Sequence, residues 1–297
     1  EMCIRDRRKP AGSPTGGQFD RKPHALTGVV EMGENNYSGQ TLRSVTSTSA
    51  DLRKADFRGA TLANYTIFED CDVKGARFNR ASIDADFTQC HMEGSVFQDA
   101  DLDFTHFYRC QVGDADFSGS RIEDVRITET SMKGADLSGC AISSTTCECS
   151  TLTAINAHAL KVDGLELEAC EICDSDFSHA RTECMCLYET NARGVNAQDA
   201  VFMYPIVRGG DLSGTQWQNA VIHGGKITDC SMRESSFEGA RVHASRFVGC
   251  DFTGATFKGA DFDGTKLVEC TLSDAQAEEL IQRGATIKPS RNCDDHE

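Results

Sequence analysis

Large apolar residues recur at every fifth position along most of the chain. The segment from Val248 to Leu272 reads VGCDFTGATFKGADFDGTKLVECTL, and its fifth-residue series is Phe252, Phe257, Phe262, Leu267 and Leu272. A strand repeats its inward side chains every second residue and a helix about every 3.6 residues, so neither keeps this series on one inward line. The pattern predicts a chain that changes direction every five residues.

The series of large residues, here called centres, changes frame twice near its start and then continues unbroken. The first centres are Leu42, Ser47, Leu52, Phe57, Leu62 and Ile67; one extra residue then shifts the frame to Val73, Phe78 and Ile83. A shorter step restores it at Phe87, and from there the period holds to Leu272. The residue two positions before a centre is small, and the residue directly before it is polar, often Asp.

Two columns of like residues repeat every twenty positions, which indicates four five-residue sides in each turn of the chain. The small position is cysteine at Cys90, Cys110, Cys170, Cys230, Cys250 and Cys270. A column of aromatic centres contains Phe97, Phe117, Phe177, Trp217, Phe237 and Phe257, and it is weakened at Ala157 and Ala197. Columns of like residues predict stacked coils, with these twelve side chains in the core.

Units such as Ala135-Asp136-Leu137 and Ala260-Asp261-Phe262 resemble the pentapeptide-repeat family, whose motif is written A(D/N)LXX. The resemblance covers residues 40–272, about 47 pentapeptides. It implies an all-β fold, a right-handed quadrilateral parallel β-helix of about twelve coils. A coil spacing of ~4.8 Å gives a rod roughly 55 Å long. Alternating large and small inward residues should fill its narrow interior without voids.

The segments outside the repeat are assigned from their composition. Ser273-Asp274-Ala275-Gln276 fits a capping box, so we expect a capping helix over residues 273–284; a homodimer through this helix is the alternative. Residues 1–39 are expected to form a disordered tail and residues 285–297 a polar tail. Residues 1–7, EMCIRDR, resemble a translated sequencing-library end and are interpreted as an artefact, which leaves the true N-terminus open.

The 15 cysteines could suggest a disulfide framework or a zinc site. The expected register argues for buried thiols instead, because it points Cys147 and Cys170 inward but Cys173 and Cys186 outward. Four sulfurs so placed cannot surround one ion, and we expect no metal and no other cofactor. No histidine is paired by spacing with a Ser or Cys nucleophile, and a filled rod offers no pocket, so we do not expect an enzyme. Buried thiols favour a cytoplasmic protein.

Charge is the remaining indication of function. The chain has a formal net charge of −16, and residues 40–272 hold 35 acids and 21 bases. Basic residues are dispersed and no run approaches ~20 apolar residues, so direct nucleic-acid binding and a membrane span are not expected. The acidic surface that we single out contains Asp99, Asp101, Asp116, Glu123, Asp124 and Asp136. Solubility alone would also account for an acidic surface.

The family resemblance makes the charge more specific. Quinolone-resistance proteins of the Qnr and MfpA type are acidic rods that bind DNA gyrase or topoisomerase IV in place of DNA, and the chain resembles them in its acidic rod and its cysteine column. It differs from them in having no clear projecting loop. The resemblance implies a noncatalytic protein-binding solenoid that imitates DNA toward a type II topoisomerase. The alternative is a structural or adaptor scaffold for another protein; a continuous negative stripe would favour mimicry, and mixed patches would favour a scaffold.

Overall fold

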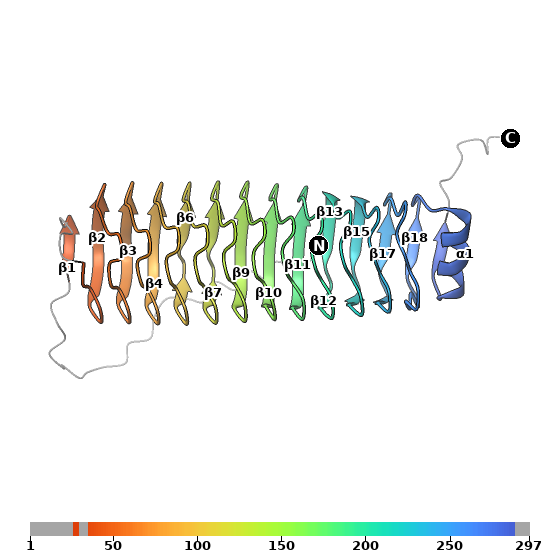
Figure 1. Ribbon diagram of the computed structural model, residues 1–297, viewed down its shortest axis with the longest axis horizontal. Coiled ribbons are helices and arrows are strands. Elements are labelled where there is room, and N and C mark those ends of the chain that lie inside the picture. Colours follow the sequence, from red (N-terminus) through yellow and green to blue (C-terminus); the bar gives the residue numbers. More distant parts are fainter. Residues whose placement is uncertain (1–25, 30–34, 289–297) are drawn as a thin grey trace, which may run out of the picture.

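The computed structural model describes residues 26–29 and 35–288 as a straight stack of coils with one helix at its C-terminal end (Figure 1). The fold is a right-handed, four-sided parallel β-helix of about twelve turns, which confirms the predicted fold class. The expected artefact at residues 1–7 and the C-terminal residues 289–297 lie outside the described residues. Within those residues, no helix combines the length and apolar character needed to cross a bilayer.

Each turn of the chain has four sides, numbered here 1 to 4 in chain order, and β-strands form on the first two. Six strands run through sides 1 and 2: β2 (Thr41–Thr48), β3 (Thr61–Glu69), β4 (Ser82–Thr88), β9 (Ala141–Glu148), β10 (Lys161–Glu168) and β11 (Arg181–Tyr188). Five lie on side 1: β5 (Asp101–Asp103), β7 (Arg121–Glu123), β12 (Val201–Met203), β14 (Val221–His223) and β16 (Arg241–His243). Seven begin on side 2: β6 (His106–Tyr108), β8 (Arg126–Thr128), β13 (Ile206–Asp211), β15 (Lys226–Ser231), β17 (Arg246–Val248), β18 (Lys266–Val268) and β19 (Thr286–Lys288). The strand β1 (Leu26–Val29) precedes them and pairs with β2.

Sides 3 and 4 are held by single parallel bridges between coils. Side 4 runs through Asp116, Asp136 and Asn156, each bridged to the residue twenty positions later. Its corner closes with a turn in which the Ser120 N–H donates to the Phe117 carbonyl at 3.0 Å. Gly119 at that corner has a φ of 70°, a conformation that glycine adopts without steric cost. The five-residue period is therefore one short extended segment followed by one corner.

Stacked rings fill the N-terminal half of the interior. On side 4, the rings of Phe57, Phe78, Phe97 and Phe117 lie 4.6–4.7 Å apart in parallel planes. Offset stacking of this kind adds to the burial of apolar area. The other aromatic centres singled out in the sequence, Phe177, Trp217, Phe237 and Phe257, are buried as well. Of the six column cysteines, five are buried, whereas Cys270 in the last coil is half-buried.

The frame change near the start lies one corner earlier than predicted. Phe68, rather than Ile67, is the fully buried centre, and its ring stacks on Phe87 at 5.0 Å. Ile67 pairs with Asp86 at an outward position and is only half-buried. The extra residue lies before Thr66, because Asn64 and Tyr65 both take positive φ at the corner. The prediction of Ile67 as a centre was wrong.

The ordered repeat extends beyond residues 40–272 at both ends. Tyr37, in the expected tail, is buried and its ring stacks on Phe57 at 4.8 Å. At the other end, β19 pairs in parallel with β18, and Ile287 packs against the core, although residues 285–297 were expected to be a polar tail. An apolar side chain at an inward position is enough to continue the stack without the full pentapeptide pattern.

The helix α1 (Asp274–Gln282) covers the last coil. Ser273 is its N-cap and Gln276 completes the predicted capping box. The Gln276 Nε2 also donates to the carbonyls of Phe252 and Ala255 at 2.8 and 2.9 Å, and Leu280 is fully buried. The helix thus satisfies backbone acceptors and covers apolar side chains that an open solenoid end would expose.

Candidate protein-binding surface

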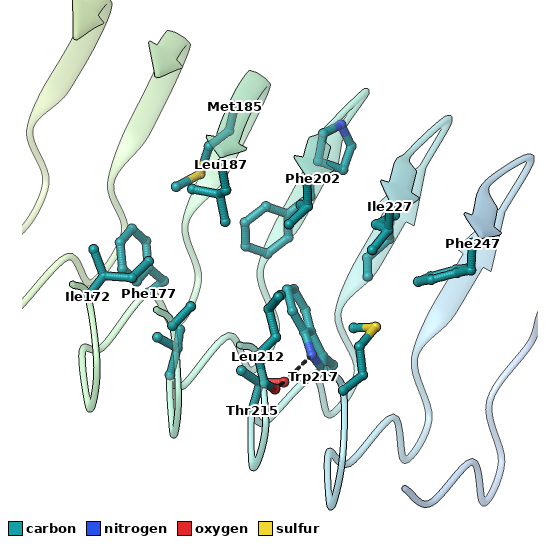
Figure 2. A pocket seen from close by; sticks show the side chains of 16 residues that line it. Ile172, Phe177, Met185, Leu187, Phe202, Leu212, Thr215, Trp217, Ile227 and Phe247 are labelled. Atoms are coloured by element: carbon teal, nitrogen blue, oxygen red, sulfur yellow. Dashed lines mark hydrogen bonds between the residues drawn. The ribbon is translucent and has the colours of Figure 1, made fainter. Parts of the chain in front are cut away.

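The interior of the described coils contains small cavities that are lined mainly by apolar side chains. A cavity of about 50 Å³ lies between Phe177 and Phe247 and is lined almost entirely by apolar side chains (Figure 2). Its one hydroxyl, on Thr215, accepts a hydrogen bond from Trp217 Nε1 at 2.7 Å. A second cavity, of about 40 Å³, lies nearer the middle of the rod. The interior is therefore less completely filled than predicted.

The two cavities fall where the aromatic column is interrupted. Ala157 and Ala197 are fully buried on side 4, at positions that hold Phe or Trp in other coils. A methyl group fills less of the interior than a ring, and the rigid coils cannot close the gap. Such small voids offer a substrate few polar groups, because the hydroxyls of Thr215 and Thr145 already form hydrogen bonds within the protein.

The cysteines do not converge on a metal site. In the ranges that the structure covers, no group of three or more His, Cys, Asp or Glu side chains is placed to hold a metal ion. Cys147 and Cys170 are buried with their sulfurs 3.6 Å apart, while Cys173 is half-buried at an outward position. Cys186 is buried, although the register predicted an outward thiol; it occupies an outward position, opposite Glu166 in the strand pairing, that neighbouring side chains cover.

Burial keeps at least part of the cysteine set protonated at neutral pH. Burial raises the pKa of the Cys140 thiol to about 12. A hydrogen bond with Cys110, together with burial, raises the pKa of Cys90 to about 12 as well. A thiol is a poor nucleophile and metal ligand compared with a thiolate. These cysteines act as small apolar residues that pack beside the centres.

The six predicted surface acids divide between two neighbouring sides of the rod. Asp99, Asp116 and Asp136 lie on side 4 or its corner, whereas Asp101, Glu123 and Asp124 lie on side 1. The side 1 group is partly neutralised, because Arg121 forms ion pairs with Asp101, at 2.7 Å, and with Glu123. The two groups therefore differ in the negative charge that they present.

Side 1 also contains a carboxyl group, that of Asp103, whose surroundings disfavour ionisation. Burial raises the pKa of Asp103, and the neighbouring acids Asp124, Asp101 and Asp84 act in the same direction against the opposing effect of Arg121. Its Oδ1 atom is buried and has no hydrogen-bond partner among the described residues. The electrostatic effect of Asp84, Asp101 and Asp124 on Asp103 shows that these four acids lie close together on the surface.

Side 4 carries the longest stretch of surface without a basic side chain. Between Arg80 and Lys258, its outward positions contain no Lys or Arg over eight successive coils. The six acids on this stretch, here called the side 4 stripe, are Asp99, Asp116, Asp136, Asp176, Asp199 and Glu238. Two histidines, His158 and His179, lie among them. On sides 1 to 3, Lys and Arg recur at shorter intervals.

Hydrogen bonds hold the central stripe carboxylates in fixed positions. Asp136 accepts from the Ser138 N–H at 2.9 Å and from Asn156 Nδ2 at 3.0 Å. Asp176 accepts in the same way from Ser178 at 2.9 Å and from Asn196 at 3.0 Å. These neutral donors orient the carboxylates while leaving their charge in place.

Among the described residues, ion pairs involve only the acids at the two ends of the stripe. Arg80 lies 4.0 Å from Asp99, and Lys258 lies 3.3 Å from Glu238. No Lys or Arg forms an ion pair with the four acids between them, within the described part of the chain. The sequence-based selection missed Asp176, Asp199 and Glu238, although the twenty-residue period assigns them to the same side as Asp116.

Comparison with known proteins identifies the repeat. The family model described as "Pentapeptide repeat region" matches residues 66–137, and the model "Pentapeptide repeats (8 copies)" matches residues 235–274. The chain is a pentapeptide-repeat protein. No curated protein sequence matched it.

Several solved structures resemble this pentapeptide-repeat protein. HetL from the cyanobacterium Nostoc sp. strain PCC 7120, described as involved in the regulation of heterocyst differentiation, is 17% identical, with a TM-score of 0.47 over 78% of this chain and 91% of HetL. QnrB1, described as a plasmid-mediated fluoroquinolone resistance protein, is 22% identical, with a TM-score of 0.33 over 87% of this chain and 95% of QnrB1. A pentapeptide-repeat protein of the Arabidopsis thaliana thylakoid lumen is 19% identical, with a TM-score of 0.17 over 42% of this chain and 77% of that protein. The functions in these descriptions belong to those proteins.

Proposed function

We propose that this pentapeptide-repeat protein is a noncatalytic, cytoplasmic binding protein whose side 4 stripe occupies the DNA-binding groove of a type II topoisomerase such as DNA gyrase or topoisomerase IV. The observation that carries the proposal is the absence of Lys and Arg from side 4 over eight coils that contain six acids. A groove that binds DNA attracts negative charge largely irrespective of sequence. Mimicry requires a negative stripe without intervening bases, and six of the eight coils carry an acid here.

The dimensions of the stripe suit this role. Eight coils at ~4.8 Å span ~34 Å, which is about one turn of B-DNA. One strand of duplex DNA carries a charge every ~3.4 Å, whereas six acids over this length give one every ~6 Å. We therefore expect weaker binding than that of DNA itself, and an interaction that weakens as salt is added.

A gyrase supercoiling assay with the purified full chain tests the proposal. We expect inhibition of supercoiling, or protection of the enzyme from a quinolone, at micromolar protein and low salt. A control protein of similar net charge and a different fold should have neither effect. Neither inhibition nor protection under these conditions would remove topoisomerase binding as the function.

An adaptor scaffold for another protein is the second candidate, and the mixed charge of the other sides favours it. On side 3, Lys74 pairs with Glu93 at 3.5 Å and Arg233 with Asp251 at 3.2 Å. Such pairs leave little net charge, so recognition there would depend on shape and hydrogen bonding. A protein that leaves gyrase unaffected yet captures a defined partner through side 3 would favour this function.

The homodimer also stays a prediction. Ile281 on α1 is 58% exposed at the capped end of the rod, where a second copy could cover it. Light scattering at micromolar concentration would give twice the chain mass for a dimer. The variant Ile281→Lys should then return the monomer, because a charge at the centre of an apolar contact opposes association.

A further inference from the structure

The corner between sides 1 and 2 changes length in two consecutive coils. Between the paired positions Leu62–Ile83 and Thr66–Ala85, the β3 coil has three residues and the β4 coil has one, Asp84. The preceding β2 coil and the following β5 coil have two residues at the equivalent place. The corner therefore projects at β3, is recessed at β4 and returns to its ordinary length at β5.

An exposed aromatic side chain stands on each side of the recessed corner. Tyr65 on the β3 coil is 82% exposed and Phe104 on the β5 coil is 63% exposed. Both have positive φ, 64° and 53°, where a bulky side chain is uncommon. Corners two coils apart are separated by ~10 Å, and a planar group held between two rings needs ~7–8 Å. Tyr65, Asp84 and Phe104 are here called the notch.

The floor of the notch carries a negative charge without a matching positive one. Asp84 is half-buried and has no ion-pair partner among the described residues. Arg43 and Arg121 on side 1 each lie two coils from Asp84, and Arg121 is already paired with Asp101 and Glu123. The surrounding acids would therefore add to the attraction of a cation entering the notch.

We propose that the notch binds an arginine side chain of a protein partner. A guanidinium is planar, stacks on aromatic faces and donates two parallel hydrogen bonds to a carboxylate. The two rings would sandwich its faces while Asp84 accepts from its edge. No residue of the notch belongs to the side 4 stripe, so this proposal does not depend on topoisomerase binding.

An NMR titration of the full chain with N-acetylarginine amide tests the proposal, and N-acetylcitrulline amide serves as the neutral isostere. We expect saturable shifts of the Tyr65, Asp84 and Phe104 amides with the arginine compound, at a dissociation constant on the order of 1–10 mM. The citrulline compound should cause no saturable shift there. No saturation with arginine, or equal shifts with both compounds, would overturn the proposal.

Three variants locate the binding. Asp84→Asn and Phe104→Ala should each weaken binding of N-acetylarginine amide at least about fivefold, because they remove the charge and one of the two rings. Tyr204→Ala is the matched control, since Tyr204 is also exposed, has a φ of 53° and occupies the same corner beside coils of ordinary length. An unchanged melting temperature verifies folding. Equal weakening by all three variants, or by none, would contradict a site at the notch.

Discussion

Phe257 shows how strictly the interior limits a single residue. Its side chain is 1% exposed, and its ring lies 5.6 Å from that of Phe237 and 5.5 Å from that of Phe262. We expect Phe257→Asp to destabilise the rod by at least about 3–5 kcal/mol, since the buried carboxylate would have no partner. The control Phe257→Leu keeps a large apolar side chain and should lower the free energy of unfolding by about 1 kcal/mol. Thermal unfolding checks both, and equal melting temperatures for Phe257→Asp and the parent chain would contradict the register.

Asp103 gives a residue-scale prediction of pH dependence. Its pKa is raised in the folded protein, chiefly by burial, so folding favours the protonated carboxyl. The stability that Asp103 contributes is therefore greatest below the unfolded pKa of ~3.9 and is lost as the pH rises through the folded value. Asp103→Asn should raise the melting temperature at pH 7. The gain in the free energy of unfolding should be less than about 1 kcal/mol, because solvent screens the carboxylate.

The comparison at low pH separates charge from packing. Near pH 3 the gain from Asp103→Asn should vanish, because the parent carboxyl is then protonated in both states. The matched control is Asp163→Asn, at the equivalent but exposed position of β10. A gain for Asp103→Asn that is the same at both pH values would show that its cause is not the charge of Asp103.

At the scale of elements, α1 closes the C-terminal end of the rod. Gln276→Ala removes the hydrogen bonds to the carbonyls of Phe252 and Ala255 and the capping-box hydrogen bond from the Ser273 N–H, which together should cost about 1–3 kcal/mol. Because each coil contacts only its neighbours, the loss should stay local. Amide hydrogen exchange should accelerate in β17 and β18 but not in β9.

The exposed Glu278 provides the control on the same helix. Glu278→Ala should leave exchange in β17 and β18 unchanged. Faster exchange along the whole rod after Gln276→Ala would indicate that the coils unfold as one unit rather than from the end.

The five-residue period predicted one side and one corner per unit, and the twenty-residue columns added the four sides of each coil and their stacking. It did not locate the inserted residue, since Ile67 and Phe68 are adjacent and both apolar, and only pairing with β4 distinguishes them. It also missed β19, whose coil follows a helix rather than another repeat. Cys186 was misjudged because position alone does not show which neighbouring side chains cover an outward residue.

The prediction of the surface was less complete than that of the core. Inward residues are constrained by packing, whereas outward residues tolerate most polar side chains, so no local pattern separates a binding side from a solvated one. Side 4 stands out only when charges are assigned to sides around the closed coil. Asp99 and Asp101 are close in sequence but lie at the corner and on the next side.

At the scale of the whole molecule, the central claim is that the side 4 stripe, and not total acidity, competes with DNA. The stripe variant carries Asp116→Asn, Asp136→Asn, Asp176→Asn and Asp199→Asn. Asparagine already occupies positions 156 and 196, which are equivalent to Asp116, Asp136 and Asp176, and position 219, which is equivalent to Asp199, so this variant should keep the fold. The matched control removes the same charge from side 2 with Glu148→Gln, Glu166→Gln, Glu168→Gln and Glu189→Gln.

The most direct measurement is the displacement of a fluorescently labelled DNA duplex from gyrase, followed by anisotropy at low salt. The parent chain and the side 2 control should displace the duplex, and the stripe variant should need at least about tenfold more protein, a difference of ~1.4 kcal/mol. Displacement should also weaken as salt is raised. No displacement by the parent chain, or equal loss in the stripe variant and the side 2 control, would contradict the claim.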